Sequence, residues 1–260
     1  MTRLLLCAIL SVLAGIATAQ VRVGTLVIRS KETWELKNSD ILVADTLIMQ
    51  DSSTLVLNKL KKENYIRARV AIFGNGVIID GRGVDGQPGR DGFSGSTPFG
   101  PCSDGTPGRA GTRGLDGTSG VNLFMYLDEV TIGDKFIIDL SGGKGGKGGS
   151  GGNGGGGSPG TVHCNGGNGG NGGNAGQGGN GANGGTLTLS SQKHPYIEKL
   201  IGSRINVYTH GGLPGEQGRV GNRGPAGLGP SRKNGKNGEP GLEAPNGLAG
   251  INGKVNFEKN

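Results

Sequence analysis

Glycine recurs at every third position through three long blocks of this chain, and this spacing constrains the fold more than any other feature. The blocks span residues 83–120, 142–185 and 212–253. Ordering glycine costs more backbone entropy than ordering any other residue, so an unpatterned glycine excess would predict a disordered linker. A period of three instead places every third residue on one side of a polyproline-II helix. The spacing therefore favours ordered polyproline-II segments over disorder.

Each block loses its phase near the middle, at residues 96–104, 161–165 and 230–234. A collagen helix needs three uninterrupted chains, and proline is scarce here, with 11 in the whole chain. We expect instead that each block is an arm that turns at its break and returns, which makes six segments in a bundle. At ~3.1 Å per residue, an outgoing segment of roughly 18 residues projects ~55 Å.

The second block differs because its triplets are Gly-Gly-X, whereas the outer blocks are mostly Gly-X-Y. Two bare positions per turn allow close neighbours on two sides, which places this arm in the middle of the stack. Polyproline-II helices have no internal hydrogen bonds, so their amides must bond to neighbours or to water. The glycines expected in the bundle core are Gly142, Gly145, Gly148, Gly166, Gly169 and Gly172.

Short apolar runs with a period of two fill the rest of the chain. They are rich in β-branched residues and are separated by Asn, Asp, Ser and Gly, which is typical of strands joined by turns. We predict a short β-solenoid over residues 20–82, strands at 121–140 and 186–210 between the arms, and a last strand in 254–260. The predicted fold class is thus all-β plus polyproline-II. A β-sandwich or jelly roll is the alternative for the strands.

The first 19 residues have the pattern of an export signal. Arg3 precedes an apolar run from Leu4 to Ile16, and Ala17 and Ala19 are small residues at the positions that a signal peptidase reads. A buried N-terminal helix is the alternative. No later run has the ~20 apolar residues that a membrane span needs. We therefore expect a signal peptide over residues 1–19 and a secreted, extracellular or cell-surface protein without a membrane span.

Two cysteines remain after the predicted cleavage, and both lie at predicted turning points. Cys102 belongs to the break of the first arm and Cys164 to the break of the second. Adjacent arms of similar length bring their tips together, so we predict a disulfide between these residues. Free thiols or intermolecular bridges are the alternatives. On the chain-entropy view, closing a loop of about 60 residues contributes ~4 kcal/mol.

The Gly-Gly-Asn triplets and the tip cysteines resemble the glycine-rich antifreeze proteins of springtails. The pattern is also similar to the glycine-rich domain of Obg-type GTPases and to bacteriophage tail-fibre adhesins with polyglycine tips. The resemblance covers roughly residues 83–253 and is one of pattern rather than alignable sequence. It implies a six-segment bundle of polyproline-II helices in two layers, with ice binding or recognition at the tips. No nucleotide-binding motif accompanies it.

A search for catalytic or metal-binding patterns returns little. The carboxylates are scattered, and His163 beside Cys164 supplies two residues where a structural zinc site needs four ligands. No glycine-rich string lies between a strand and a helix as a phosphate loop does. We expect no enzyme, no cofactor, no metal and no nucleic-acid partner. The net charge of +7 favours anionic polymers or surfaces, although dispersed basic residues equally serve solubility.

These features favour a secreted, non-enzymatic structural or adhesive protein. Its expected partners are further copies of itself, or a polysaccharide or protein of the cell surface or matrix. The strand edges at Val21–Ile28 and Val255–Phe257 are candidates for stacking between copies into a filament. The alternative is ice binding by a flat bundle face, against which the bulky charged residues of the outer arms argue. The residues expected to carry recognition at the tips, unless the tips are merely turns, are Phe99, Pro101, His163, Arg232 and Lys233.

Overall fold

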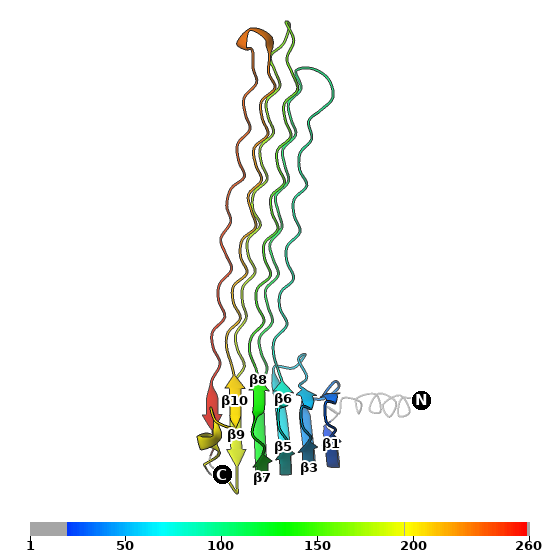
Figure 1. The fold of residues 1–260 in the computed structure, drawn as a ribbon, viewed down its shortest axis with the longest axis vertical. Helices are drawn as coiled ribbons and strands as arrows, with labels where there is room; N and C mark the ends of the chain where they lie inside the picture. The colour runs from blue at the N-terminus through cyan, green and yellow to red at the C-terminus, as the bar shows by residue number, and fades with distance from the viewer. Residues whose placement is uncertain (1–19, 195, 259–260) are drawn as a thin grey trace, which may run out of the picture.

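The computed structural model describes residues 20–194 and 196–258, in which strands form a base and long arms project from it (Figure 1). The strands arise where the sequence alternates apolar and polar residues, so that one set of side chains can face the core. The elements in chain order are β1 (Val21–Ile28), β2 (Thr33–Glu35), β3 (Ile41–Met49), β4 (Thr54–Val56), β5 (Glu63–Phe73), β6 (Val77–Asp80), β7 (Asn122–Ile132), β8 (Phe136–Asp139), β9 (Leu187–Ser191), the 3-10 helix η1 (Ile197–Leu200), β10 (Ile205–Tyr208), the 3-10 helix η2 (Pro230–Arg232) and β11 (Val255–Phe257).

Successive strands alternate between two sheets. The odd-numbered strands form a six-stranded sheet in the order β1-β3-β5-β7-β9-β11, and the even-numbered strands form a five-stranded sheet in the order β10-β8-β6-β4-β2. Every strand pair in these two sheets is parallel. Each circuit of the chain therefore adds one strand to each sheet, and the connection is either a short turn or an arm.

The core lies between the two sheets and is built from columns of residues in register. Their side chains are fully buried, and burying each one stabilises the fold by roughly 1.5–3 kcal/mol. Phe73 of β5 stacks on Phe136 of β8 with ring centroids 4.3 Å apart, which joins the sheets directly. The columns include Leu42, Ile66 and Met125 in the six-stranded sheet and Leu55, Ile79 and Ile138 in the five-stranded sheet.

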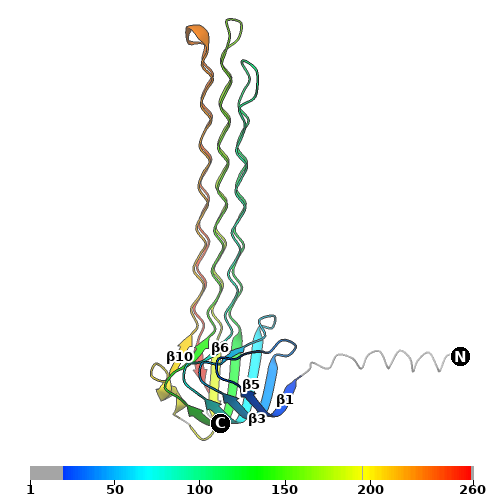
Figure 2. The same cartoon turned by 45° about the vertical axis from the view of Figure 1, so that its right-hand side comes forward.

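Three arms leave the sheets on the same side and return to them (Figures 1 and 2). They comprise residues 81–121, 140–186 and 209–254, which follow β6, β8 and β10 respectively. The Gly89 N–H donates to the Lys147 carbonyl at 2.7 Å, and the Gly148 N–H donates to the Glu216 carbonyl at 2.8 Å. Arm two therefore lies between arms one and three, as its double glycines predict. We call the three hydrogen-bonded arms the shaft.

Outgoing and returning segments are also hydrogen-bonded to each other. Within arm one, the Arg109 N–H donates to the Phe93 carbonyl at 2.8 Å, and bonds of this kind recur every three residues. Across arms, the Gly149 N–H donates to the Thr112 carbonyl at 2.9 Å. A side chain at Gly149 would collide with the carbonyl of Arg90, so the approach of the segments requires glycine there. The triplet spacing thus supplies a lateral hydrogen bond at each repeat.

Some backbone N–H groups of the arms donate to side-chain oxygens instead of to backbone carbonyls. In arm two, the Lys144 N–H donates to Asp85 Oδ1 at 2.7 Å and the Ser150 N–H to Asp91 Oδ1 at 2.6 Å. Asparagines of arm two accept from arm three in the same manner, as in the 2.8 Å bond from the Lys236 N–H to Asn168 Oδ1. These contacts satisfy otherwise unpaired polar groups and define the register between neighbouring arms.

The predicted fold class of all-β plus a six-segment polyproline-II bundle is wrong. The regular structure of the described residues is two parallel sheets with two short 3-10 helices, and no polyproline-II element is among it. The physical reason is that a glycine period of three identifies the residue that faces a neighbouring segment, and does not by itself define a helix. The alternative of a β-sandwich or jelly roll is also wrong, because those folds are built from antiparallel strands and every strand pair here is parallel. The alternation of strands between two sheets is compatible with a solenoid.

The predicted signal peptide, residues 1–19, lies outside the described residues. Within residues 20–194 and 196–258, the structure has no helix with the length and apolar character needed to cross a membrane.

Candidate functional site

The five residues predicted to act in recognition lie in the turns at the far end of the shaft, where the three tips gather (Figure 2). All five side chains are exposed to solvent. Within the described part of the chain, no hydrogen bond or ion pair links one of them to another. The tips are thus three separate exposed turns at one end of the molecule. Phe99 and Pro101 lie on arm one, His163 on arm two, and Arg232 and Lys233 on arm three.

A disulfide joins the tips of arms one and two. It links Cys102 to Cys164 with their Cα atoms 6.0 Å apart, which is the pairing predicted from the sequence. The Cys102 N–H also donates to the Pro159 carbonyl at 2.8 Å. On the other side of arm two, the Gly160 N–H donates to the Leu228 carbonyl of arm three at 2.8 Å. The three tips are therefore tied together at their base.

The tip of arm three is a tight turn with a strained backbone. The Lys233 N–H donates to the Pro230 carbonyl at 3.1 Å, and the two residues between them, Ser231 and Arg232, have φ values of 54° and 64°. Left-handed φ at both central positions is the pattern of a type I′ turn, which strongly favours Asn-Gly. A left-handed residue other than glycine costs roughly 1–2 kcal/mol. The turn thus displays a cationic side chain where glycine would relieve strain.

Hydrogen bonds on both flanks hold this turn in place. The Gly229 N–H donates to Asn234 Oδ1 at 2.9 Å, which closes the base of the turn. The carbonyl of Lys233 accepts from the Gly166 N–H of arm two at 2.8 Å. Such surrounding contacts are what a strained conformation needs in order to persist.

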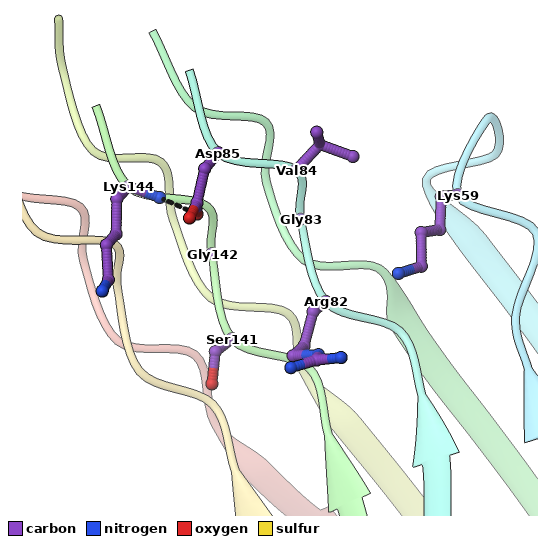
Figure 3. A pocket seen from close by; sticks show the side chains of 8 residues that line it. All are labelled: Lys59, Arg82, Gly83, Val84, Asp85, Ser141, Gly142 and Lys144. Atoms are coloured by element: carbon purple, nitrogen blue, oxygen red, sulfur yellow. Dashed lines mark hydrogen bonds between the residues drawn. The ribbon is translucent and has the colours of Figure 1, made fainter. Parts of the chain in front are cut away.

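A groove of about 520 Å³ lies at the opposite end of the shaft, where arms one and two leave the sheets (Figure 3). It contains three cationic side chains and combines residues from the turn after β4 with the first residues of both arms. It was not among the sites predicted from the sequence. The residues that line it are Lys59, Arg82, Gly83, Val84, Asp85, Ser141, Gly142 and Lys144.

Asp80, at the end of β6, organises the charges beside this groove. The Arg82 Nε donates to Asp80 Oδ1 at 3.0 Å, and Lys59 Nζ lies 3.3 Å from Oδ2. Burial of the carboxyl acts to raise its pKa, but the hydrogen bonds from Arg82 and the charge of Lys59 outweigh burial, so the pKa of Asp80 is lowered. The hydrogen bond to Asp80 in turn raises the pKa of Arg82. Asp80 is thus a stable anion that anchors two cations.

Two aspartates beside the groove form a structural joint between the strands and the arms. Asp80 Oδ1 accepts from the Arg82 N–H at 3.0 Å, and Asp139 Oδ1 accepts from the Ser141 N–H at 3.0 Å. An aspartate that bonds the backbone two residues ahead favours a turn, so each of these two arms leaves its strand in a defined direction. Asp80 and Asp139 are register partners on neighbouring strands. An aspartate at the end of each of these two strands is the sequence signal from which the joint could have been predicted.

The six glycines predicted for the bundle core lie along arm two, with three on each of its segments. Their N–H groups donate to carbonyls of arm three, as in the 2.9 Å bond from Gly145 to Leu213 and the 2.8 Å bond from Gly169 to Lys236. A side chain at any of the six would meet a backbone carbonyl. The carbonyls near the first three glycines belong to the returning segment of arm two, and those near the last three belong to arm three. These positions therefore govern how closely the two segments of arm two approach each other and how closely arm three approaches them.

No family model, curated protein or solved structure matches this chain.

Proposed function

We propose that this chain is a secreted, non-enzymatic structural or adhesive protein that holds three recognition tips away from a β-sheet base. The observation that carries the proposal is the lateral hydrogen bonding that runs from the base of the shaft, at Gly83 and Ser141, to its tips, at Gly160 and Leu228. A projection made of one segment would bend freely, whereas segments bonded every three residues move together. The disulfide at the tips supports the interpretation that the arms move together, because it joins two arms where they are farthest from the base.

Three tips on one support suit attachment to a surface with repeated epitopes. Each tip is small and exposed, so a single contact would be weak. Linking several weak contacts on one support raises the overall avidity by ~10²–10⁴-fold if all of them can engage together. The shaft provides that geometry because its arms cannot separate without breaking lateral hydrogen bonds.

Binding by the full secreted chain tests this proposal. The chain is immobilised, and the retention of cells and of extracted cell-surface polysaccharide is measured against a variant with alanine at Phe99, Pro101, His163, Arg232 and Lys233. We expect retention by the native chain and a loss of at least tenfold in the variant. Retention by neither protein, or equal retention by both, would contradict adhesion through the tips.

Self-association is a second candidate function, which the edges of the six-stranded sheet favour. β1 and β11 are its outermost strands, and the column that starts at Val21 and passes through Leu42, Ile66, Met125 and Leu189 ends at Phe257. Val21 is half-buried and Phe257 is 37% exposed, so both ends of the column have room for a further strand.

Pairing of β11 with β1 of the next copy would build a filament. With six strands per copy in this sheet, the axial repeat would be about 29 Å at ~4.8 Å per strand. Light scattering after size-exclusion chromatography, followed by electron microscopy, tests this arrangement. A monomer at high concentration would exclude it.

A further inference from the structure

The turn at the tip of arm three concentrates unpaired positive charge. Residues 228–238 contain Arg232, Lys233 and Lys236 but no acidic residue. All three side chains are exposed, and none of them takes part in an ion pair within the described residues. Two cations at the base of the shaft, Arg82 and Lys59, differ from them because both are held by Asp80. Tip charges that no protein group neutralises remain available to an anionic partner.

The backbone of this turn presents Arg232 in a defined way. Arg232 and Ser231 occupy the two left-handed positions, where Asn-Gly would be less strained. The flanking bonds to Asn234 and Gly166 keep the turn from relaxing. The strained turn therefore keeps a charged side chain at its apex.

We propose that this turn binds an acidic polysaccharide, an inference that rests on the adhesive function proposed above. The planar guanidinium of Arg232 matches the two oxygens of a carboxylate or a sulfate, and Lys233 and Lys236 add point charges beside it. Small ligands are usually enclosed in a concave pocket, but this tip is an exposed turn. A long polymer with repeated charges suits such a tip, because the tip can form a weak contact with any of the charges along the polymer.

The composition of the tip favours a polysaccharide over a nucleic acid. Proteins that bind single strands combine basic residues with aromatic side chains on which bases stack. Residues 228–238 contain no aromatic residue. Charge recognition without a stacking platform fits the carboxylates or sulfates of a sugar chain.

Two matched variants of the full chain test the proposal. Arg232→Gln removes the charge at the apex, and Arg223→Gln removes the same charge from an exposed position in the shaft of the same arm. We expect at least tenfold weaker binding of Arg232→Gln to immobilised polygalacturonate, dextran sulfate or both, and a change of less than twofold for Arg223→Gln. Binding by the native chain to one of these polymers identifies the carboxylate or the sulfate as the group recognised.

A third variant separates charge from turn geometry. Ser231→Asn with Arg232→Gly installs the preferred type I′ sequence, so the turn stays folded while the charge is lost. We expect it to bind as weakly as Arg232→Gln and to unfold at the same temperature as the native chain or a higher one. Retained binding in either Arg232 variant, or an equal loss in Arg223→Gln, would overturn the proposal.

The outcomes also distinguish this inference from the adhesive function. If the native chain retains cells but binds neither acidic polymer, the polysaccharide inference fails and adhesion stands. If it retains neither cells nor polymers, both fail. Tighter binding to single-stranded DNA than to either polysaccharide would assign the tip to nucleic acid and overturn the proposal.

Discussion

Replacing Gly149 with alanine tests whether the shaft depends on contact between bare backbones. Gly149 lies in the outgoing segment of arm two, and a methyl group there would collide with the carbonyl of Arg90 in arm one. Gly156, in the same segment, is the matched control. The nearest atoms to a methyl group at Gly156 are Thr97 Oγ1 at 3.1 Å and Pro225 Cγ at 3.5 Å, and both belong to side chains.

The size of the effect follows from the bonds between these two segments. To restore an ordinary C···O separation of about 3.3 Å at Gly149, the segments must move apart by roughly 1 Å. Three hydrogen bonds span the gap at this level: Gly89 N–H to the Lys147 carbonyl and Gly92 N–H to the Ser150 carbonyl, both at 2.7 Å, and Ser150 N–H to Asp91 Oδ1 at 2.6 Å. At about 1 kcal/mol each, their loss destabilises the shaft by about 2–4 kcal/mol.

Hydrogen exchange of the arm amides measures this change directly, with urea unfolding as a second readout. We expect Gly149→Ala to accelerate exchange at the neighbouring glycines by about 30- to 1,000-fold, which is the same 2–4 kcal/mol. Gly156→Ala should leave exchange near the native rate. Equal effects of the two substitutions, or a change below threefold at Gly149, would show that the two segments are not in close contact.

Two further predictions concern the disulfide and the joint at the base. Replacing Cys102 and Cys164 by serine should lower the unfolding free energy by up to ~4 kcal/mol, since the bridge closes a long loop. Thermal unfolding checks this, and a native chain unaffected by reductant would contradict it. Asp80→Asn should lower stability at neutral pH by about 1 kcal/mol, a figure reduced because Arg82 is 57% exposed. In the folded chain the pKa of Asp80 lies below its usual value of 3.8. The charge of Asp80 therefore contributes fully to stability at pH values above the pKa of the unfolded chain, and this contribution is lost as the pH falls through the pKa of the folded chain. The difference between native and variant, followed by urea unfolding from pH 7 to pH 2, should therefore shrink below about pH 4. If the stability difference between the native chain and the variant stayed constant over this pH range, the charge of Asp80 would be excluded as the cause of that difference.

Much of the shaft was predictable because its information is local. The breaks near Cys102 and Cys164 placed the turning points, and arms of similar length then implied the disulfide that the structure contains. The double glycines of arm two implied neighbours on two sides, and its hydrogen bonds to arms one and three confirm this. The role of the tip residues in recognition remains a prediction, although the structure places these residues together at one end of the shaft.

The remaining features depend on pairs of residues that are distant in sequence. Lys59 and Asp80 are 21 residues apart and meet only because successive strands align side by side. The bond from Lys144 to Asp85 likewise spans 59 residues. No local pattern specifies such pairs, since their separation depends on the length of each circuit of the chain. The strain at Ser231 and Arg232 was equally hidden, because their sequence does not favour a type I′ turn.

The sequence alone predicts where the chain alternates between strand and arm, because periods of two and three reflect which side chains face a neighbour. It also determined that close approach occurs at glycine, since a Cβ cannot fit against a carbonyl. The parallel pairing of the strands in two sheets, and the contact of Asp80 with both Arg82 and Lys59, emerge only from the folded arrangement. A repeating pattern predicts that one face of a segment is buried, but which segment packs against that face depends on the packing of the whole chain.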